Sequence, residues 1–174
     1  MSDRLRGKDW LSFGLKTLGE EGFTALKADR MARALNVSRG SFYWHFKNLR
    51  HFHEALLDHW KTTTTDIIID DIDTRSDTAL RTLIGEAFNA DRKLERAIRA
   101  WATETEWVGE RVASLDKRRI TFIEKLLEAQ GIAQNAIPVR ATVLYWAYLG
   151  GALVQHTRLP DGQLDALVDM MLGK

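Results

Sequence analysis

The stretch Lys27–Lys47, KADRMARALNVSRGSFYWHFK, decides how the rest of the chain is interpreted. Apolar residues at helical spacing run over about Ala28–Leu35, and a second helical run covers Arg39–Phe46. Between them, Asn36-Val37-Ser38 breaks the pattern. Asn tolerates the left-handed backbone of a tight turn, and Ser at the third position is a favoured helix N-cap. The stretch therefore predicts a helix, a three-residue turn and a second, short helix.

The second of these helices carries more aromatic side chains than one core can accept. Phe42 and Phe46 are four residues apart and are expected to face inward. Successive helix positions differ by about 100°, so at least one residue of Tyr43–His45 must be exposed. An exposed flat side chain beside Arg39 and Lys47 favours a nucleic-acid-binding surface over a hairpin with ordinary packing aromatics. Two helices of this size and rhythm are typical of a helix-turn-helix, whose second helix lies in the DNA major groove.

The charge is distributed unevenly along the chain. Its 174 residues carry a formal net charge of +1, but residues 1–61 hold 11 Lys and Arg against 7 Asp and Glu, and the remainder is net acidic. A basic first third indicates that this end meets a polyanion, although ordinary scatter in composition gives the same imbalance. There is no cysteine, which excludes disulfides and thiolate metal sites. No purely apolar run approaches the ~20 residues needed to cross a bilayer, so we expect no membrane association and a cytoplasmic location.

The periodicity of the whole sequence predicts an all-α fold. Strand-like alternation is nearly absent, and the only prolines, Pro138 and Pro160, come late. The segment Thr62–Thr74 stays open between a continued helix and a loop, since its threonines and isoleucines are weak helix formers. The expected helices cover residues 6–20, 28–35, 39–46, 49–63, 76–89, 92–104, 108–130, 134–156 and 161–172.

The residues that most resemble a chemical site do not form a recognised catalytic or metal-binding motif. His51, His53 and His59 are spaced by two, six and eight residues, whereas two zinc ligands on a helix are usually four apart. A serine-hydrolase elbow and a phosphate-binding glycine loop are both missing. We therefore predict no enzyme activity, no metal and no cofactor.

The first third of the sequence resembles the tetracycline-repressor (TetR) family of transcriptional regulators. The matching segments are Glu21-Gly22-Phe23, the turn Leu35–Ser38 and the segment Arg39–Lys47. Over that last segment the family has a basic residue, Gly, Ser or Thr, an apolar residue, Tyr, any residue, His or Tyr, Phe and often Lys, and every position is met. Two positions depart from the family. Asn36 replaces the usual Gly. Lys27 replaces a Ser or Thr that caps the helix expected over Ala28–Leu35, and the loss of this cap costs about 1 kcal/mol of stability.

The resemblance implies an amino-terminal helix-turn-helix domain, residues 1–48, and a helical effector-binding and dimerisation domain, residues 49–174. It implies that Arg39, Gly40, Tyr43 and Trp44 face the major groove. It also implies that Ser38, Ser41, Tyr43, His45 and Lys47 reach phosphates, with Lys27 as a further DNA contact. Family members hold a small molecule among the later helices. The residues predicted for such a pocket are Arg99, Trp101, Trp107, Phe122, Tyr145 and Tyr148, and the alternative for each is a place in an ordinary core.

The last two helices are predicted to form a dimer interface. Residues Val143 to Val154 are apolar on nearly every side, which requires cover from more than one direction. The resemblance implies that the last two helices pair with those of a second subunit in a four-helix bundle, while the alternative is that they only close the monomer's core. The predicted interface residues are Trp146, Ala147, Gly150, Gly151, Leu164, Leu167, Val168 and Met171.

Together these features predict a ligand-responsive regulator, a repressor, that binds palindromic double-stranded DNA as a homodimer and is released by an unknown small-molecule effector. The alternative is a helical ligand-binding or adaptor protein without operator-specific DNA binding.

Overall fold

The computed structural model of the chain describes residues 5–154 and 162–173. Within those ranges the ordered elements are all helices, so the predicted fold class is confirmed. None of the described helices has the length and hydropathy needed to cross a membrane. The predicted connection at Pro160 lies outside the described residues. The chain divides into two compact units, one made of residues up to 64 together with 93–111, and one made of 65–92 together with residues from 112 onward.

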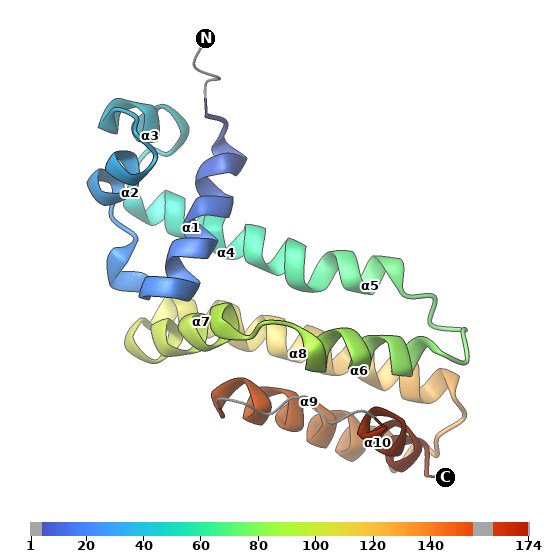
Figure 1. The fold of residues 1–174 in the computed structure, drawn as a ribbon. Coiled ribbons are helices and arrows are strands. Elements are labelled where there is room, and N and C mark those ends of the chain that lie inside the picture. Colours follow the sequence, from blue (N-terminus) through green and yellow to red (C-terminus); the bar gives the residue numbers. More distant parts are fainter. Residues whose placement is uncertain (1–4, 155–161, 174) are drawn as a thin grey trace. The chain divides into compact units, whose positions relative to one another are not determined.

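The first unit contains the predicted helix-turn-helix (Figure 1). Its elements are α1 (Gly7–Glu21), a 3-10 turn (Phe23–Ala25), α2 (Ala28–Ala34), α3 (Arg39–His45), α4 (Leu49–Lys61), α7 (Lys93–Glu104) and the first residues of α8 (Glu106–Ala129). Helix α1 packs against α4 and α7, and α2 packs against α3. The observed helix boundaries in this unit lie within two residues of the predicted ones.

Aromatic side chains form the centre of this first unit. Phe42 of α3 is completely buried, and its ring centroid lies 5.4 Å from that of Trp10 and 5.3 Å from that of Phe52. Gly14 lets α1 approach α4 closely, because a Cβ atom there would lie 2.8 Å from the Phe52 ring. This aromatic core anchors α3 to α1 and α4.

Most of the segment Thr62–Thr74, which the sequence left open between a continued helix and a loop, is helical. A π-helical turn (Thr62–Asp66) follows α4 and leads into α5 (Ile67–Asp71), so the chain stays helical as far as Asp71. The Thr63 and Thr64 hydroxyls donate to the carbonyls of His59 and Trp60, at 2.9 and 2.8 Å. Such back-bonding by threonine competes with the regular backbone pattern, which explains a local change of helix type at this place.

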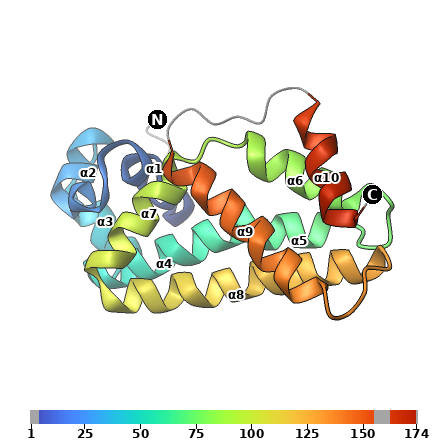
Figure 2. The ribbon, with the colours of Figure 1, turned by 90° about the horizontal axis from the view of Figure 1, so that it is seen from below.

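The second unit contains α6 (Ala79–Asn89), most of α8, α9 (Ile137–Leu153) and α10 (Gln163–Leu172). Helix α6 contacts both α9 and α10 (Figure 2). The core of the second unit is apolar and includes Ile84, Leu126, Leu144 and Met171. The Arg140 guanidinium donates to the Met171 carbonyl at 2.6 Å and so satisfies the carboxyl end of α10.

These compact units do not coincide with the two domains predicted from the sequence. The first unit takes in residues 49–64 and 93–111, which the sequence analysis assigned to the effector-binding domain. A compact unit is defined by packing, whereas the predicted boundary after residue 48 separates functions. The functional division at residue 48 stays a prediction.

Candidate nucleic-acid interface

The turn between α2 and α3 is set by backbone geometry. Asn36 has a φ of 53°, which is the left-handed conformation expected for it and the single positive φ of a non-glycine residue in the described chain. The Val37 amide donates to the Ala32 carbonyl at 3.0 Å and ties the turn to the end of α2. A side chain that tolerates this φ replaces glycine here, so the departure from the family pattern at Asn36 leaves the turn intact.

Helix α3 presents large side chains to solvent while its phenylalanines anchor it. Phe42 and Phe46 are buried, as predicted. Trp44 is 66% exposed and Tyr43 is 42% exposed, which confirms that the aromatic run extends outside the core. Exposed aromatic side chains next to the basic Arg39 and Lys47 are typical of a nucleic-acid-binding surface.

Arg39, at the start of α3, is held by two neighbours. Its Nε lies 3.1 Å from an Asp29 carboxylate oxygen, and its Nη2 donates to the Tyr43 hydroxyl at 3.3 Å. The guanidinium carbon also lies 5.3 Å from the centre of the Tyr43 ring. The hydrogen bond to Tyr43 and the charge of Asp29 raise the pKa of Arg39 above its ordinary value, so its charge is fixed. Nothing in the sequence marked Asp29 as a partner of Arg39, since an acid in the first turn of a helix usually acts only on the helix dipole.

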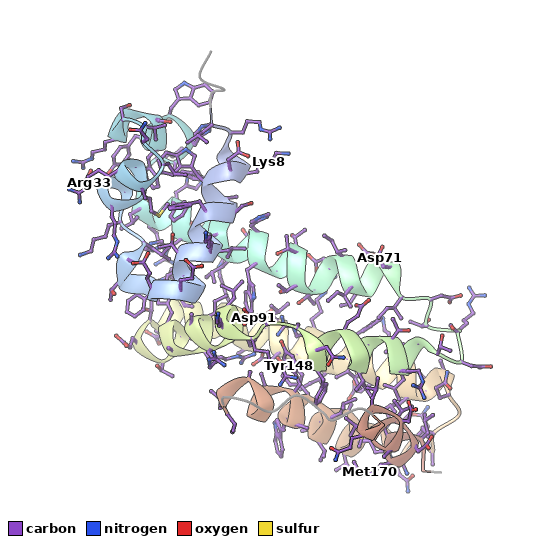
Figure 3. All side chains as sticks on the ribbon, viewed as in Figure 1. Lys8, Arg33, Asp71, Asp91, Tyr148 and Met170 are labelled. Atoms are coloured by element: carbon purple, nitrogen blue, oxygen red, sulfur yellow. The ribbon has the colours of Figure 1, made fainter. Side chains whose placement is uncertain are left out.

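The remaining residues predicted to contact DNA differ in how far they are exposed to solvent. Lys27, Ser38, Gly40 and Lys47 are exposed, whereas Ser41 and His45 are partly buried. Arg30 and Arg33 of α2 add exposed positive charge, although Arg30 pairs with Glu21. Arg33 projects away from the ribbon (Figure 3). The DNA contacts of all these residues stay predictions.

Two capping expectations are resolved by the structure. Ser38 occupies the N-cap of α3, but its hydroxyl makes no capping hydrogen bond, so the prediction of a side-chain cap is wrong. Lys27 occupies the N-cap of α2 and, as expected, provides no cap. Both helix amino termini thus keep backbone N–H groups that favour an anion such as a phosphate.

His45 has a contact within the protein that the sequence did not reveal. Its Nε2 lies 2.8 Å from the Leu5 carbonyl, which ties the chain before α1 to the end of α3. This nitrogen is engaged inside the unit, so any phosphate contact by His45 has to use the rest of the ring.

His53 connects α4 to the segment before α2 and to α7. Its Nε2 lies 3.3 Å from the Leu26 carbonyl, and its ring meets the Trp101 ring edge to face at 5.0 Å. Burial lowers the pKa of His53 below its ordinary value and the charge of Arg50 lowers it further, while the bond to Leu26 opposes both. The imidazole is therefore a neutral packing group at the base of the helix-turn-helix.

A pH dependence of stability follows from this lowered pKa. Below about pH 6.5 the unfolded chain binds a proton at His53 that the folded chain resists, so stability is lost as the pH falls toward the folded pKa. We expect His53→Gln, which keeps a donor for Leu26, to flatten the loss of stability between pH 7 and pH 5. Thermal unfolding of both proteins across this range tests it, and identical slopes would contradict the assignment. His51→Gln, at an exposed position on the same helix, is the matched control.

The residues predicted for an effector pocket divide between the two units. Arg99, Trp101 and Trp107 lie in the first unit, and Phe122, Tyr145 and Tyr148 lie in the second. Trp101 is buried and stacks on Phe23 with a centroid distance of 6.0 Å, while the Arg50 guanidinium lies 3.7 Å from the centre of the Trp107 ring. Arg99 pairs with Glu95, so all three side chains have partners within the first unit, and their part in an effector pocket stays a prediction.

In the second unit, Tyr148 lies among polar and aromatic neighbours. The guanidinium carbons of Arg92 and Arg119 lie 5.3 and 5.9 Å from the centre of its ring, and the Tyr145 ring stacks on it at 5.9 Å. Arg92 is only 8% exposed and donates to the carbonyls of Phe88 and Tyr148. Arg92 was not predicted from the sequence, because nothing in the local pattern marks an arginine as buried.

The predicted dimer-interface residues also divide. On α9, Trp146, Ala147 and Gly150 are exposed and lie on one face with Val139, Val143 and Leu153, which are exposed as well. In contrast, Val168 and Met171 of α10 are buried in the chain's own core, and Leu164 and Leu167 pack against that core. Gly151 is close to the Arg92 guanidinium of the same chain. The contacts of α10 and Gly151 within the single chain thus agree with the alternative interpretation, in which these residues only complete the core of the monomer.

Within residues 5–154 and 162–173, no three His, Asp or Glu side chains are grouped so as to hold a metal ion.

The arrangement of α2, turn and α3, with polar and aromatic side chains displayed on α3, defines a helix-turn-helix DNA-binding protein. The sequence model of bacterial regulatory proteins of the tetR family matches residues 11–56, the part of the chain that contains α2, the turn and α3. The match supports a DNA-binding transcriptional regulator. A search of curated proteins gave no significant match.

Two solved structures share the fold over nearly their whole length. The crystal structure of BioQ with its double-stranded DNA operator is 26% identical and has a TM-score of 0.50, covering 98% of this chain and 99% of BioQ. Native NalD, the secondary repressor of the MexAB-OprM multidrug efflux pump in Pseudomonas aeruginosa, is 22% identical with a TM-score of 0.60. That similarity covers 96% of this chain and 94% of NalD, and it supports the fold of the second unit as well as the first.

Proposed function

We propose that the chain is a homodimeric transcriptional repressor that binds a palindromic operator through α3 and is released from it by a small-molecule effector. The observation that carries this proposal is the exposed surface of α3. Its aromatic and basic side chains face solvent, while Phe42 fixes the helix to the core of the unit. BioQ, the 26% identical neighbour, is solved on its double-stranded operator, which supports DNA as the partner. A role on DNA requires a cytoplasmic location.

The exposed face of α9 supports dimerisation. Trp146 is 65% exposed, and Val139, Val143 and Leu153 lie at helical spacing on the same side. Monomeric proteins rarely display a continuous apolar stripe of this kind, and a second copy of the chain buries it in a two-fold contact. In such a dimer the two α3 helices have to be about 34–36 Å apart to enter successive major grooves, which makes the operator palindromic.

The surroundings of Tyr148 support an effector site in the second unit. Aromatic rings with a few placed polar groups are typical of small-molecule sites, and here Tyr145 also donates to Asp116 at 2.6 Å. An effector releases the operator only if it binds the two states of the protein with affinities that differ by a few kcal/mol. Phe122, Tyr145 and Tyr148 are the residues retained for this site, and Arg92 is added to them.

Substitutions at Arg39 and Lys47 test the DNA-binding role of α3. Arg39→Ala is expected to remove about 1–3 kcal/mol of discrimination at one base pair, because arginine can bond guanine through two donors. Lys47→Ala is expected to weaken binding to every sequence alike and to reduce the salt slope by about 1. Titration of labelled duplexes at several salt concentrations measures both.

Lys125→Ala is the matched control, since Lys125 is exposed on α8 in the second unit. It is expected to change neither the affinity nor the salt slope. If Arg39→Ala and Lys47→Ala also leave both quantities unchanged, α3 is not the DNA-binding element, and the helical adaptor protein becomes the better description.

A further inference from the structure

Helix α2 carries a carboxylate at the place where the proposed interface meets DNA. Asp29 lies in the first turn of α2, and its carboxylate is 3.1 Å from the Arg39 Nε on α3. Both side chains are more than half exposed. An exposed ion pair of this kind adds little to folding stability, because water screens the two charges. A negative charge on a surface that attracts phosphates also opposes binding. The position of Asp29 therefore requires another explanation than stability or general affinity.

The contacts of Arg39 supply that explanation. Asp29 faces Nε, and Tyr43 accepts a hydrogen bond from Nη2 at 3.3 Å. A guanidinium has five N–H donors in one plane, so two fixed nitrogens also fix the direction in which the other donors point. Arginine otherwise has many side-chain conformations, and a mobile arginine bonds whichever phosphate is nearest. Asp29 and Tyr43 restrict Arg39 before DNA arrives.

We propose that Asp29 is a positioning residue that gives α3 sequence discrimination, by holding the Arg39 guanidinium for a base edge and offsetting its charge toward phosphates. This inference rests on the proposed DNA binding through α3. The base edge best suited to a positioned guanidinium is that of guanine, which offers the O6 and N7 acceptors side by side in the major groove. A DNA phosphate, whatever the sequence around it, has to compete with the Asp29 carboxylate for the positive charge of Arg39. Guanine instead bonds the N–H donors of Arg39 that remain.

The test compares two DNA probes. The first is the duplex that the wild-type protein enriches from a random-sequence library, and the second is the unselected library of the same length. Asp29→Asn adds one unit of positive charge, so its affinity for the unselected library is expected to rise about fivefold at 0.15 M salt, with a salt slope steeper by about 1. Its affinity for the selected duplex is expected to change by less than about twofold, because a less ordered Arg39 offsets the added charge. The ratio of the two affinities thus falls.

Three further variants separate positioning from charge. Glu21→Gln removes another exposed carboxylate that is paired with an arginine of α2, and it is expected to change both affinities alike and to leave their ratio unchanged. Asp29→Glu keeps the charge and is expected to retain most of the ratio. In an Arg39→Ala background, Asp29→Asn is expected to cause no further loss of the ratio. Circular dichroism of each variant checks that α2 is still folded.

The outcomes are distinct. If the wild type enriches a sequence and Asp29→Asn keeps the wild-type ratio, the role of Asp29 is wrong while DNA binding stands. An equal loss of the ratio in Glu21→Gln, or a further loss in the Arg39→Ala background, also overturns the role of Asp29. If the wild type enriches no sequence at all, the proposed function fails and the role of Asp29 fails with it.

Discussion

A chain that carries Val143→Glu and Trp146→Glu is expected to sediment as a monomer under conditions in which the wild type is a dimer. Both side chains are exposed in the single chain, so the substitutions leave its own core intact. In a two-fold dimer each substitution occurs twice, and the interface would have to bury four carboxylates without partners. Analytical ultracentrifugation at micromolar concentration measures the change.

The loss of the dimer is also expected to weaken operator binding by about a hundredfold or more, because each half-site then has to be held without its linked partner. Thr121→Glu is a control, since it places the same charge at an exposed position on α8 of the same unit. A double variant that remains dimeric would show that α9 is not the interface. Gly151→Arg is unsuitable for this test, because a side chain there collides with Arg92 of the same chain.

Phe42→Ala is expected to lower the free energy of unfolding of the first unit by about 3–5 kcal/mol. The Phe42 ring is completely buried and contacts Trp10, Phe46 and Phe52, with centroid distances of 5.2–5.4 Å. Its removal leaves a cavity at the point where α3 is anchored to α1 and α4. Urea titration followed by tryptophan fluorescence measures the loss, and DNA binding is expected to disappear at temperatures where the unit has melted.

Tyr43→Ala is the matched control for this prediction. It removes an aromatic ring from the adjacent position, where the side chain is largely exposed, and is expected to cost much less stability. A loss below about 1 kcal/mol for Phe42→Ala, or an equal loss for Tyr43→Ala, would contradict the account of how α3 is held.

Local sequence patterns predicted the helix-turn-helix well because its determinants are local. The left-handed turn at Asn36 follows from the intrinsic preference of that residue, and the burial of Phe42 and Phe46 follows from helical spacing. The same spacing predicted an exposed aromatic residue, which the structure identifies chiefly as Trp44. These features depend on residues a few positions apart.

The features that the sequence did not reveal depend on contacts between distant segments. The apolar stripe of α10 was predicted to meet a second subunit, and that contact stays a prediction. Periodicity cannot show what covers a stripe, and Met171 packs into the core that α6 helps to form. The burial of Arg92 and the bond from His45 to the Leu5 carbonyl likewise depend on tertiary structure. The pairing of Asp29 with Arg39 required the angle between α2 and α3, which no sequence pattern specifies.

The most direct test of the central claim is selection of DNA from a random duplex library by the wild-type chain and by a Tyr43→Ala, Trp44→Ala variant. We expect the wild type to enrich a two-fold symmetric sequence whose half-sites are about one helical turn apart. We expect the variant, with unchanged helical circular dichroism, to bind that duplex much more weakly. Enrichment of no sequence by the wild type, or equal binding of the selected duplex by both proteins, would contradict the claim that this chain reads DNA through α3.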